Sequence, residues 1–172
     1  MKYKPDSLTL ERIALACQEA LKNKPRIFIA LSGLPGSRKS TLGGYIRKNG
    51  LNTGGGGTKF YPYEIAVIDD NVMSLNLFVI RPKIKFKLDN IAQRDNLKPF
   101  LRLLPPYVKI VFCIGSSIHR LDKADIFIYL DTKEEVRKTR LLQREENNKN
   151  YLELCAASSV LILPHKFKII IQ

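Results

Sequence analysis

The sequence contains no tryptophan, only three cysteines and only two histidines. Cys17, Cys113 and Cys155 show no Cys-x-x-Cys spacing, and His119 and His165 lie too far apart to form a local metal motif. These shortages argue against a zinc site, a disulfide framework and thiol catalysis. We expect free thiols, mostly buried, in a reducing compartment, and structural or surface roles for both histidines.

Long hydrophobic runs are also absent. No apolar stretch approaches the ~20 residues of a membrane span, and the amino-terminal residues do not resemble a secretory signal. A length of 172 residues with 45% hydrophobic and 26% charged residues suits a single domain over residues 1–172 with a full core. We therefore expect a soluble, cytoplasmic protein that does not bind membranes.

Acidic residues are few, because 16 of them face 29 lysines and arginines, which gives a formal net charge of +13. Such an excess favours anionic ligands, and both nucleotide phosphates and nucleic acid qualify. The basic stretch Arg81–Lys87 alternates cations with apolar residues, a pattern typical of a protected edge strand. Nucleic-acid contact there is the less favoured interpretation.

The most informative segment is RIFIALSGLPGSRKSTL at residues 26–42, where an apolar strand pattern leads into a glycine turn, a lysine and two hydroxyls. Glycines let several backbone N–H groups converge on one anion, and the start of a helix adds the positive end of its dipole. This order predicts a phosphate-binding loop. In it Lys39 would reach the β- and γ-phosphates, Ser40 would bind Mg²⁺, and Thr41 would lie beside the α-phosphate.

Arg38 is the one departure from the pattern G-x-x-x-x-G-K-[ST], because it stands where the second glycine is expected. The apolar strand before the loop and the helix-compatible stretch after it supply the context that the pattern requires. We expect the whole loop to contact the nucleotide: Gly33, Leu34, Pro35, Gly36, Ser37, Arg38, Lys39, Ser40 and Thr41.

Apolar and amphipathic segments alternate along the chain. Helices are expected over residues 6–24, 39–48, 91–104 and 131–146, the third divided by Pro99 and the second weakened by Gly43 and Gly44, which we expect to pack against a sheet. Strands are expected just before the loop and at 64–68, 108–114 and 125–130, with 160–163 and 167–171 as candidates for a final strand. The glycine-rich segment 50–63 is expected to be a surface loop.

This alternation, with a phosphate loop after the first strand, predicts a three-layer α/β/α P-loop NTPase fold with a mostly parallel sheet. Asp69 and Asp70 follow the second strand at the edge where substrates bind, so a catalytic or metal role is favoured over a turn or cap. Arg137, Arg140 and Arg144 recur at three- and four-residue spacing on one helical face. Phosphate contact and a solvated, ion-paired face are equally consistent with that spacing.

These segments together resemble the P-loop kinases of the uridine kinase, pantothenate kinase and phosphoribulokinase group. The resemblance spans roughly residues 10–146 and is carried by IALSGLPGSRKST at 29–41, VIDD at 67–70 and ADIFIYLD at 124–131 with the arginine helix that follows. It implies an enzyme that uses ATP and Mg²⁺ to phosphorylate a hydroxyl of a small acceptor, nucleoside-like or pantothenate-like. The roles implied are catalysis by Lys39, Asp69 and Arg140, further nucleotide contacts from Arg137 and Arg144, and metal binding by Ser40, Asp69 and Asp70.

The chain departs from this group in two ways. The third core strand, 108–114, is followed by no acidic residue of the kind that orients Mg²⁺, and the lid after the arginine helix is very short, residues 147–150. Two other functions therefore stay open: a polynucleotide kinase or RNA-binding ATPase, and a degenerate nucleotide-binding protein without turnover. The acceptor pocket is expected in residues 71–107, whose sequence does not identify the acceptor.

Overall fold

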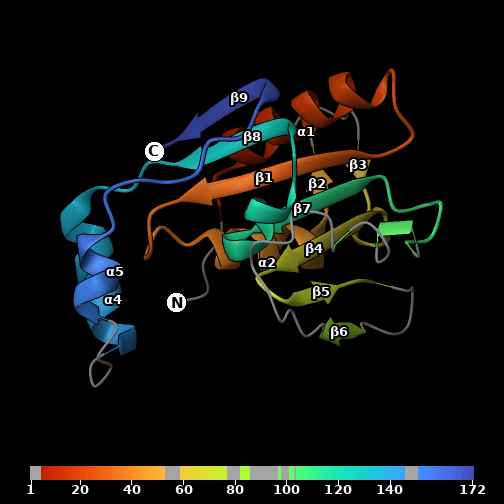
Figure 1. The fold of residues 1–172 in the computed structure, drawn as a ribbon. Coiled ribbons are helices and arrows are strands. Elements are labelled where there is room, and N and C mark those ends of the chain that lie inside the picture. Colours follow the sequence, from red (N-terminus) through yellow and green to blue (C-terminus); the bar gives the residue numbers. More distant parts are fainter. Residues whose placement is uncertain are drawn as a thin grey trace.

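A seven-stranded sheet forms the centre of the molecule (Figure 1). The structure, a computed structural model, describes residues 5–52, 59–76, 82–85, 97, 101–102, 104–145 and 151–172. The strand order is β6 (Lys83–Lys85), β5 (Val72–Ser74), β4 (Ile65–Asp69), β7 (Ile110–Ile114), β1 (Ile27–Gly33), β8 (Ala124–Leu130) and β9 (His165–Ile171). In this order the five strands from β4 to β9 pair in parallel, and β5 and β6 pair antiparallel. This confirms the predicted α/β fold with a mostly parallel sheet.

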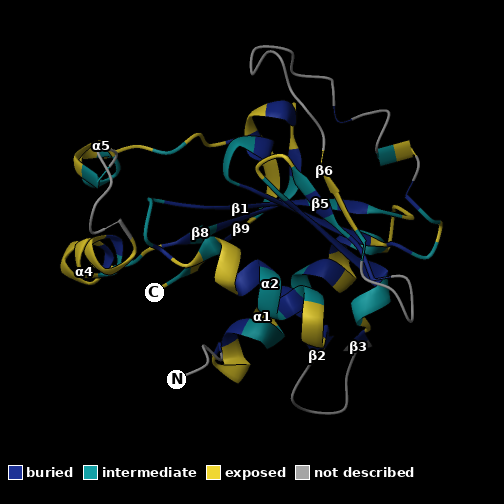
Figure 2. Cartoon of the chain, turned by 90° about the horizontal axis from the view of Figure 1, so that it is seen from below, coloured by how far each residue is buried: buried dark blue, intermediate teal, exposed yellow. Residues whose placement is uncertain are grey.

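The inner strands are buried on both faces, as their continuous apolar runs predict. Two helices, α1 (Ser7–Leu21) and α2 (Lys39–Asn49), cover one face (Figure 2) and contribute Ile13 and Leu42 to its core. The opposite face is covered by the short helix η2 (Gly115–Arg120) and by buried residues of neighbouring segments, among them Leu163.

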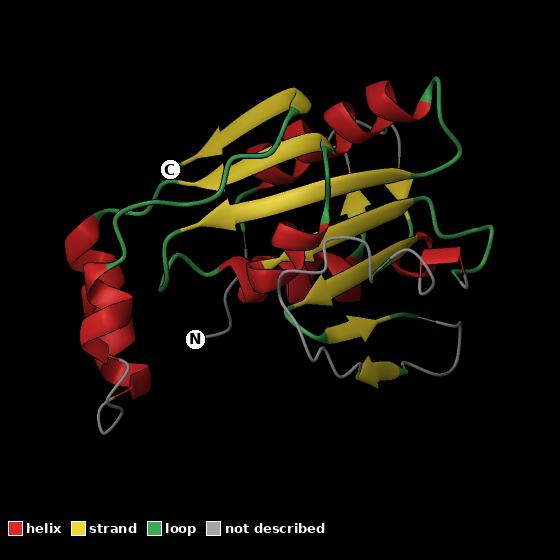
Figure 3. Cartoon of the chain, viewed as in Figure 1, coloured by secondary structure: helices red, strands yellow, loops and turns green. Residues whose placement is uncertain are grey.

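β1 lies between β7 and β8 and places the segment that follows it near the middle of the sheet's edge. From β1 the chain continues through α2 to β4, which lies on the far side of β7. From β7 it continues through η2 to β8, which lies on the opposite side of β1. Because the connections that leave β1 and β7 diverge, a crevice forms at the carboxyl ends of these two strands, where open α/β sheets bind ligands. The helices α4 (Glu134–Glu145) and α5 (Tyr151–Ala156) project beyond the same edge (Figure 1, Figure 3).

Most expected elements lie within a few residues of their predicted bounds. The first helix begins after Asp6, whose carboxylate accepts a hydrogen bond from the N–H of Thr9 at 2.7 Å. The predicted edge strand within Arg81–Lys87 is β6, which among the described residues pairs with β5 alone. The helix expected over 91–104 lies largely outside the described residues.

Two expectations were wrong. Residues 160–163 are not a strand, because they run over the face of the sheet, where only Leu163 is buried, while β9 takes the place beside β8. The segment 50–63 is not only a loop, because it contains the short antiparallel pair β2 (Leu51–Asn52) and β3 (Lys59–Phe60) and the start of η1 (Pro62–Glu64).

The cysteines and histidines differ in how far they are buried. Cys17 and Cys113 are buried free thiols, and Cys155 is a partly buried one. His119 is exposed, and the ring of His165 stacks on that of Phe127 at a centroid distance of 5.3 Å. In the part of the chain that the structure describes, no helix is both long enough and apolar enough to cross a membrane.

Candidate functional site

The loop after β1 turns tightly and packs against α4. The N–H of Ser37 donates to the carbonyl of Leu34 at 3.1 Å, which closes the turn. Gly36 has φ +85°, and a Cβ there would lie 2.8 Å from the carbonyl oxygen of Arg137 on α4. Only glycine combines this backbone conformation with so close an approach of a second backbone. The predicted glycine at this position is therefore required by local geometry.

Arg38 adopts a left-handed conformation with φ 68° and ψ 25°, and α2 begins at the next residue. The sequence pattern has a glycine here, and the backbone takes the glycine-like conformation although the residue is an arginine. For a residue with a Cβ this conformation costs about 1–2 kcal/mol. The arginine thus adopts the backbone conformation that the pattern assigns to glycine, at a cost in strain.

Lys39, the first residue of α2, folds back over the loop. Its Nζ donates to the carbonyl oxygens of Gly33 at 2.6 Å and Leu34 at 3.0 Å. Burial lowers the pKa of Lys39 to about 8, against the attraction of Asp69 and Asp70. The ammonium group is therefore still charged at neutral pH and lies beside the start of the helix, where an anion is favoured.

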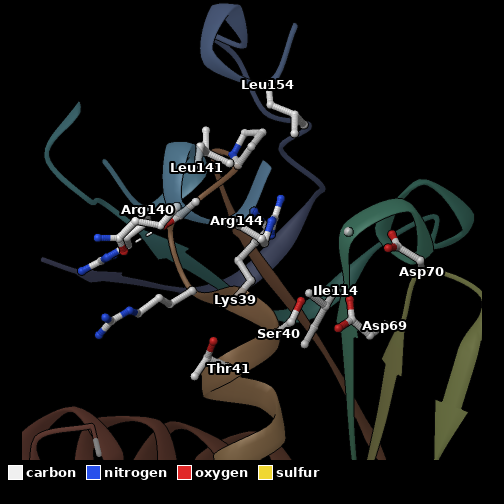
Figure 4. Close-up of a pocket in the computed structure, with 15 residues that line it drawn as sticks. Lys39, Ser40, Thr41, Asp69, Asp70, Ile114, Arg140, Leu141, Arg144 and Leu154 are labelled. Carbon is white, nitrogen blue, oxygen red and sulfur yellow. Dashed lines mark hydrogen bonds between the residues drawn. The ribbon is translucent and has the colours of Figure 1, made fainter. Parts of the chain in front are cut away.

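Asp69, the last residue of β4, faces Ser40 from the neighbouring helix (Figure 4). Burial raises the pKa of the Asp69 carboxyl, and the nearby charge of Asp70 acts in the same direction. A hydrogen bond with the Ser40 side chain and the charge of Lys39 oppose this rise. A carboxylate, a hydroxyl and an ammonium group from two separate elements are thus brought together, as the sequence predicts.

Asp70 serves a different purpose in this structure. It is exposed, has φ 50°, and its Oδ1 accepts a hydrogen bond from the N–H of Ser116 at 2.8 Å. Its own N–H donates to the carbonyl of Ile114, the last residue of β7, at 3.1 Å. The carboxylate of Asp70 therefore lies at the end of β7, a strand that has no acidic residue of its own. One of its two oxygens is engaged by the backbone there.

The three arginines of α4 reach the loop in different ways. Arg137 is buried, with Nη1 within 3.4 Å of the carbonyl of Pro35 and 3.0 Å of that of Leu154, and Nη2 within 3.2 Å of the carbonyl of Cys155. It ties the loop, α4 and α5 together, and its contact with phosphate stays a prediction. Arg140 donates to the carbonyl of Gly36 at 3.4 Å, and the side chain of Arg144 is exposed.

A cavity of about 620 Å³ opens over this group of residues, between the ends of the strands and the helices α4 and α5 (Figure 4). Every predicted catalytic and metal-binding residue lines it. The lining residues are Pro35, Gly36, Arg38, Lys39, Ser40, Thr41, Asp69, Asp70, Ile114, Gly115, Arg140, Leu141, Gln143, Arg144 and Leu154.

A second cavity of about 560 Å³ lies on the other side of the loop. It shares Arg38 and Arg140 with the first cavity, and it receives the side chain of Ser37, a buried hydroxyl with no hydrogen-bond partner among the described residues. Its remaining lining comes from the carboxyl ends of β8 and β9 and the start of α4: Leu130, Asp131, Thr132, Lys133, Val136, Ile171 and Gln172. Sequence reasoning missed this cavity, because no motif marks these residues.

The oxygen donors of the first cavity suit a hard cation bound together with phosphates. Within the described ranges, no group of three or more histidine, cysteine or acidic side chains is arranged to hold a metal ion. Mg²⁺ in phosphate-transfer sites is usually held by one or two carboxylates plus substrate phosphates and water. Ser40 and Asp69 fit that requirement.

Comparisons with protein-family models, curated proteins and solved structures give no match. The function of this chain is therefore inferred from the geometry of the two cavities.

Proposed function

We propose that this protein is a P-loop kinase that transfers the γ-phosphoryl group of ATP to a hydroxyl of a small acceptor, nucleoside-like or pantothenate-like. One observation carries the proposal. The Ser40 side chain at the start of α2 faces the Asp69 carboxylate at the end of β4, and the Lys39 ammonium group lies in the same cavity. These are the groups that phosphoryl transfer needs for phosphate, metal and acceptor.

The loop supports phosphate binding in three ways. The start of α2 supplies unpaired N–H groups and the positive end of a helix dipole. Lys39 would exchange its two carbonyl partners for phosphate oxygens, which are stronger acceptors because they are charged. The buried, unpartnered hydroxyl of Ser37 is a polar group whose burial costs free energy unless a ligand pairs with it.

The two cavities give the nucleotide a direction. The second cavity has apolar walls from Leu130, Val136 and Ile171 and a polar side chain at Thr132, a composition that suits the base and ribose. The phosphates would then pass the loop into the first cavity. The acceptor would enter that cavity from the side of Asp69 and Asp70.

In the transfer step, the acceptor oxygen forms a bond to the γ-phosphorus while the bond from that phosphorus to the bridging oxygen breaks. Asp69 positions the acceptor hydroxyl or accepts its proton, and ADP leaves with the bonding electron pair. A raised pKa makes this carboxylate a stronger base than an ordinary aspartate. Mg²⁺, when bound by Ser40 and Asp69, would offset the negative charge of the phosphates.

Lys39, Arg140 and Arg144 would stabilise charge on the equatorial oxygens of the transferred group. Arg137 would act indirectly, because its guanidinium holds α4 against the loop and so places the other two arginines.

A second candidate is a nucleotide-binding protein without turnover. It is favoured by the end of β7, which has no acidic residue, and by the hydrogen bond that already engages one oxygen of Asp70. Only Asp69 would then be left to serve both metal and acceptor.

The test is an ATP-consumption assay with Mg²⁺ against nucleosides, pantothenate-like alcohols, sugars and short oligonucleotides, with K39A as the control. Turnover with a small alcohol that K39A abolishes would support the kinase. ATP binding without turnover on any acceptor would support the second candidate. Turnover on oligonucleotides alone would favour a polynucleotide kinase, and absence of ATP binding would refute all three.

A further inference from the structure

Arg38 occupies a strained position that glycine would fill without cost. Its φ of 68° lies in the left-handed region, and no side-chain hydrogen bond caps the helix at this residue. Strained backbone that persists at a functional site is a reason to look for a role of the side chain. The question is what the guanidinium of Arg38 contributes there.

The placement of Arg38 gives the answer. Of the residues that the structure describes, Arg38 and Arg140 are the two that line both cavities. A nucleotide with its phosphates beside Lys39 and its base in the second cavity therefore has to pass these two side chains. The part that passes them is the polyphosphate chain, and a guanidinium binds phosphate oxygens in a bidentate manner.

The charges in the first cavity point the same way. Its lining includes four cationic side chains, Arg38, Lys39, Arg140 and Arg144, and two carboxylates, Asp69 and Asp70. One oxygen of Asp70 is already bonded to the N–H of Ser116, and the end of β7 adds no carboxylate. The site is therefore richer in fixed positive charge than in free ligands for a divalent cation.

We propose that Arg38 binds the polyphosphate chain where it passes between the two cavities, and that this fixed charge partly replaces the divalent cation in nucleotide binding. The inference rests on the proposed function, because it takes the loop to be a nucleotide site. It assigns to Arg38 a role that a glycine at the same position does not have.

The test is a titration of the purified protein with ATP by calorimetry at constant ionic strength, once with Mg²⁺ and once with EDTA. We expect the unmodified protein to bind ATP in EDTA within about tenfold of its affinity in Mg²⁺. R38G should lose about 10- to 100-fold in EDTA, the effect of one charge-assisted hydrogen bond, and clearly less in Mg²⁺. R38K keeps the charge but not the planar guanidinium group, so its ATP affinity in EDTA should lie between those of the unmodified protein and R38G.

K48A is the matched control, because Lys48 is an exposed cation near the other end of α2 and lines neither cavity. K48A removes one positive charge, as R38G does, and should leave the ATP affinity unchanged both in EDTA and in Mg²⁺. A melting temperature of R38G well above the temperature of the titration excludes unfolding as the cause of a lost affinity.

Two results would overturn the inference while leaving the proposed function intact: R38G binding as tightly as the unmodified protein in EDTA, or R38G losing the same factor with and without Mg²⁺. Failure of the unmodified protein to bind ATP under either condition would instead overturn the proposed function, and this inference with it.

Discussion

Replacement of Arg38 by glycine should leave the protein more stable than replacement by alanine does. Arg38 has φ 68°, and a residue with a Cβ costs about 1–2 kcal/mol in that region. Glycine removes this strain but adds about 0.4–1 kcal/mol of conformational entropy to the unfolded chain. Relative to alanine at the same position, glycine should therefore raise the free energy of unfolding by about 0.5–1 kcal/mol, which for a protein of this size raises the melting temperature by about 1–4 °C.

The comparison should be made by thermal and urea unfolding of R38G and R38A without nucleotide. R38A removes the same side-chain contacts but keeps the Cβ, so the difference between the two variants isolates the backbone strain. We expect R38G to be the more stable of the two by about 0.5–1 kcal/mol. Equal stability of R38G and R38A would refute the idea that the loop is strained at this residue.

Three further predictions concern the site. K39A should weaken ATP binding by at least about tenfold in calorimetry without lowering the melting temperature, because the ammonium group faces the cavity and bonds only to loop carbonyls. D69N should lower turnover by about 10²–10⁴-fold with little change in ATP affinity, and D70N should have the smaller effect on turnover. ATP affinity should fall as pH rises above about 8, because the pKa of Lys39 is lowered to about 8 in the free protein. The neutral amine formed above that pH does not attract phosphate. An ATP affinity that stays constant from pH 7 to 9.5 would contradict this prediction.

The loop and the nearby strand ends could be predicted from the sequence because their chemistry is local. Glycines, a lysine and hydroxyls occur within a few residues of each other, after an apolar run that can only be a buried strand or helix. Asp69 could be added because parallel strands end at a common edge. The left-handed backbone at Arg38 could not be predicted, because an arginine is a rare residue in that conformation.

The remaining features depend on residues far apart in the sequence. The use of Asp70 as a cap at the end of β7 requires β4 and β7 to be neighbours, as in the pairing of Asp69 with Ile114. The second cavity forms only because β9 pairs with β8. The sequence offered two candidates for this last strand, residues 160–163 and 167–171, and did not distinguish them. Such juxtapositions follow from strand order, which periodicity alone does not determine.

The two glycines within α2 show how the helix places Ser40 against Asp69. A Cβ on Gly43 would collide with the buried side chain of Ile114 and lie 3.5 Å from Val67, whereas nothing lies within 4 Å of a Cβ on Gly44. Of the two glycines expected to pack against the sheet, only Gly43 does so. Its missing side chain lets α2 lie close to β7 and β4, one turn beyond Ser40.

Alanine at each position should therefore have opposite effects. G44A should stabilise the protein by up to about 1 kcal/mol, because alanine is the better helix former and meets no neighbour. G43A gains the same propensity but overpacks a buried contact, which typically costs about 1–3 kcal/mol, so it should be the less stable of the two by at least about 1 kcal/mol in urea unfolding. If α2 also moves away from β4, G43A should weaken ATP binding in Mg²⁺ while G44A leaves it unchanged. Equal stability of the two variants would show that contact at Gly43 does not set the distance between Ser40 and Asp69.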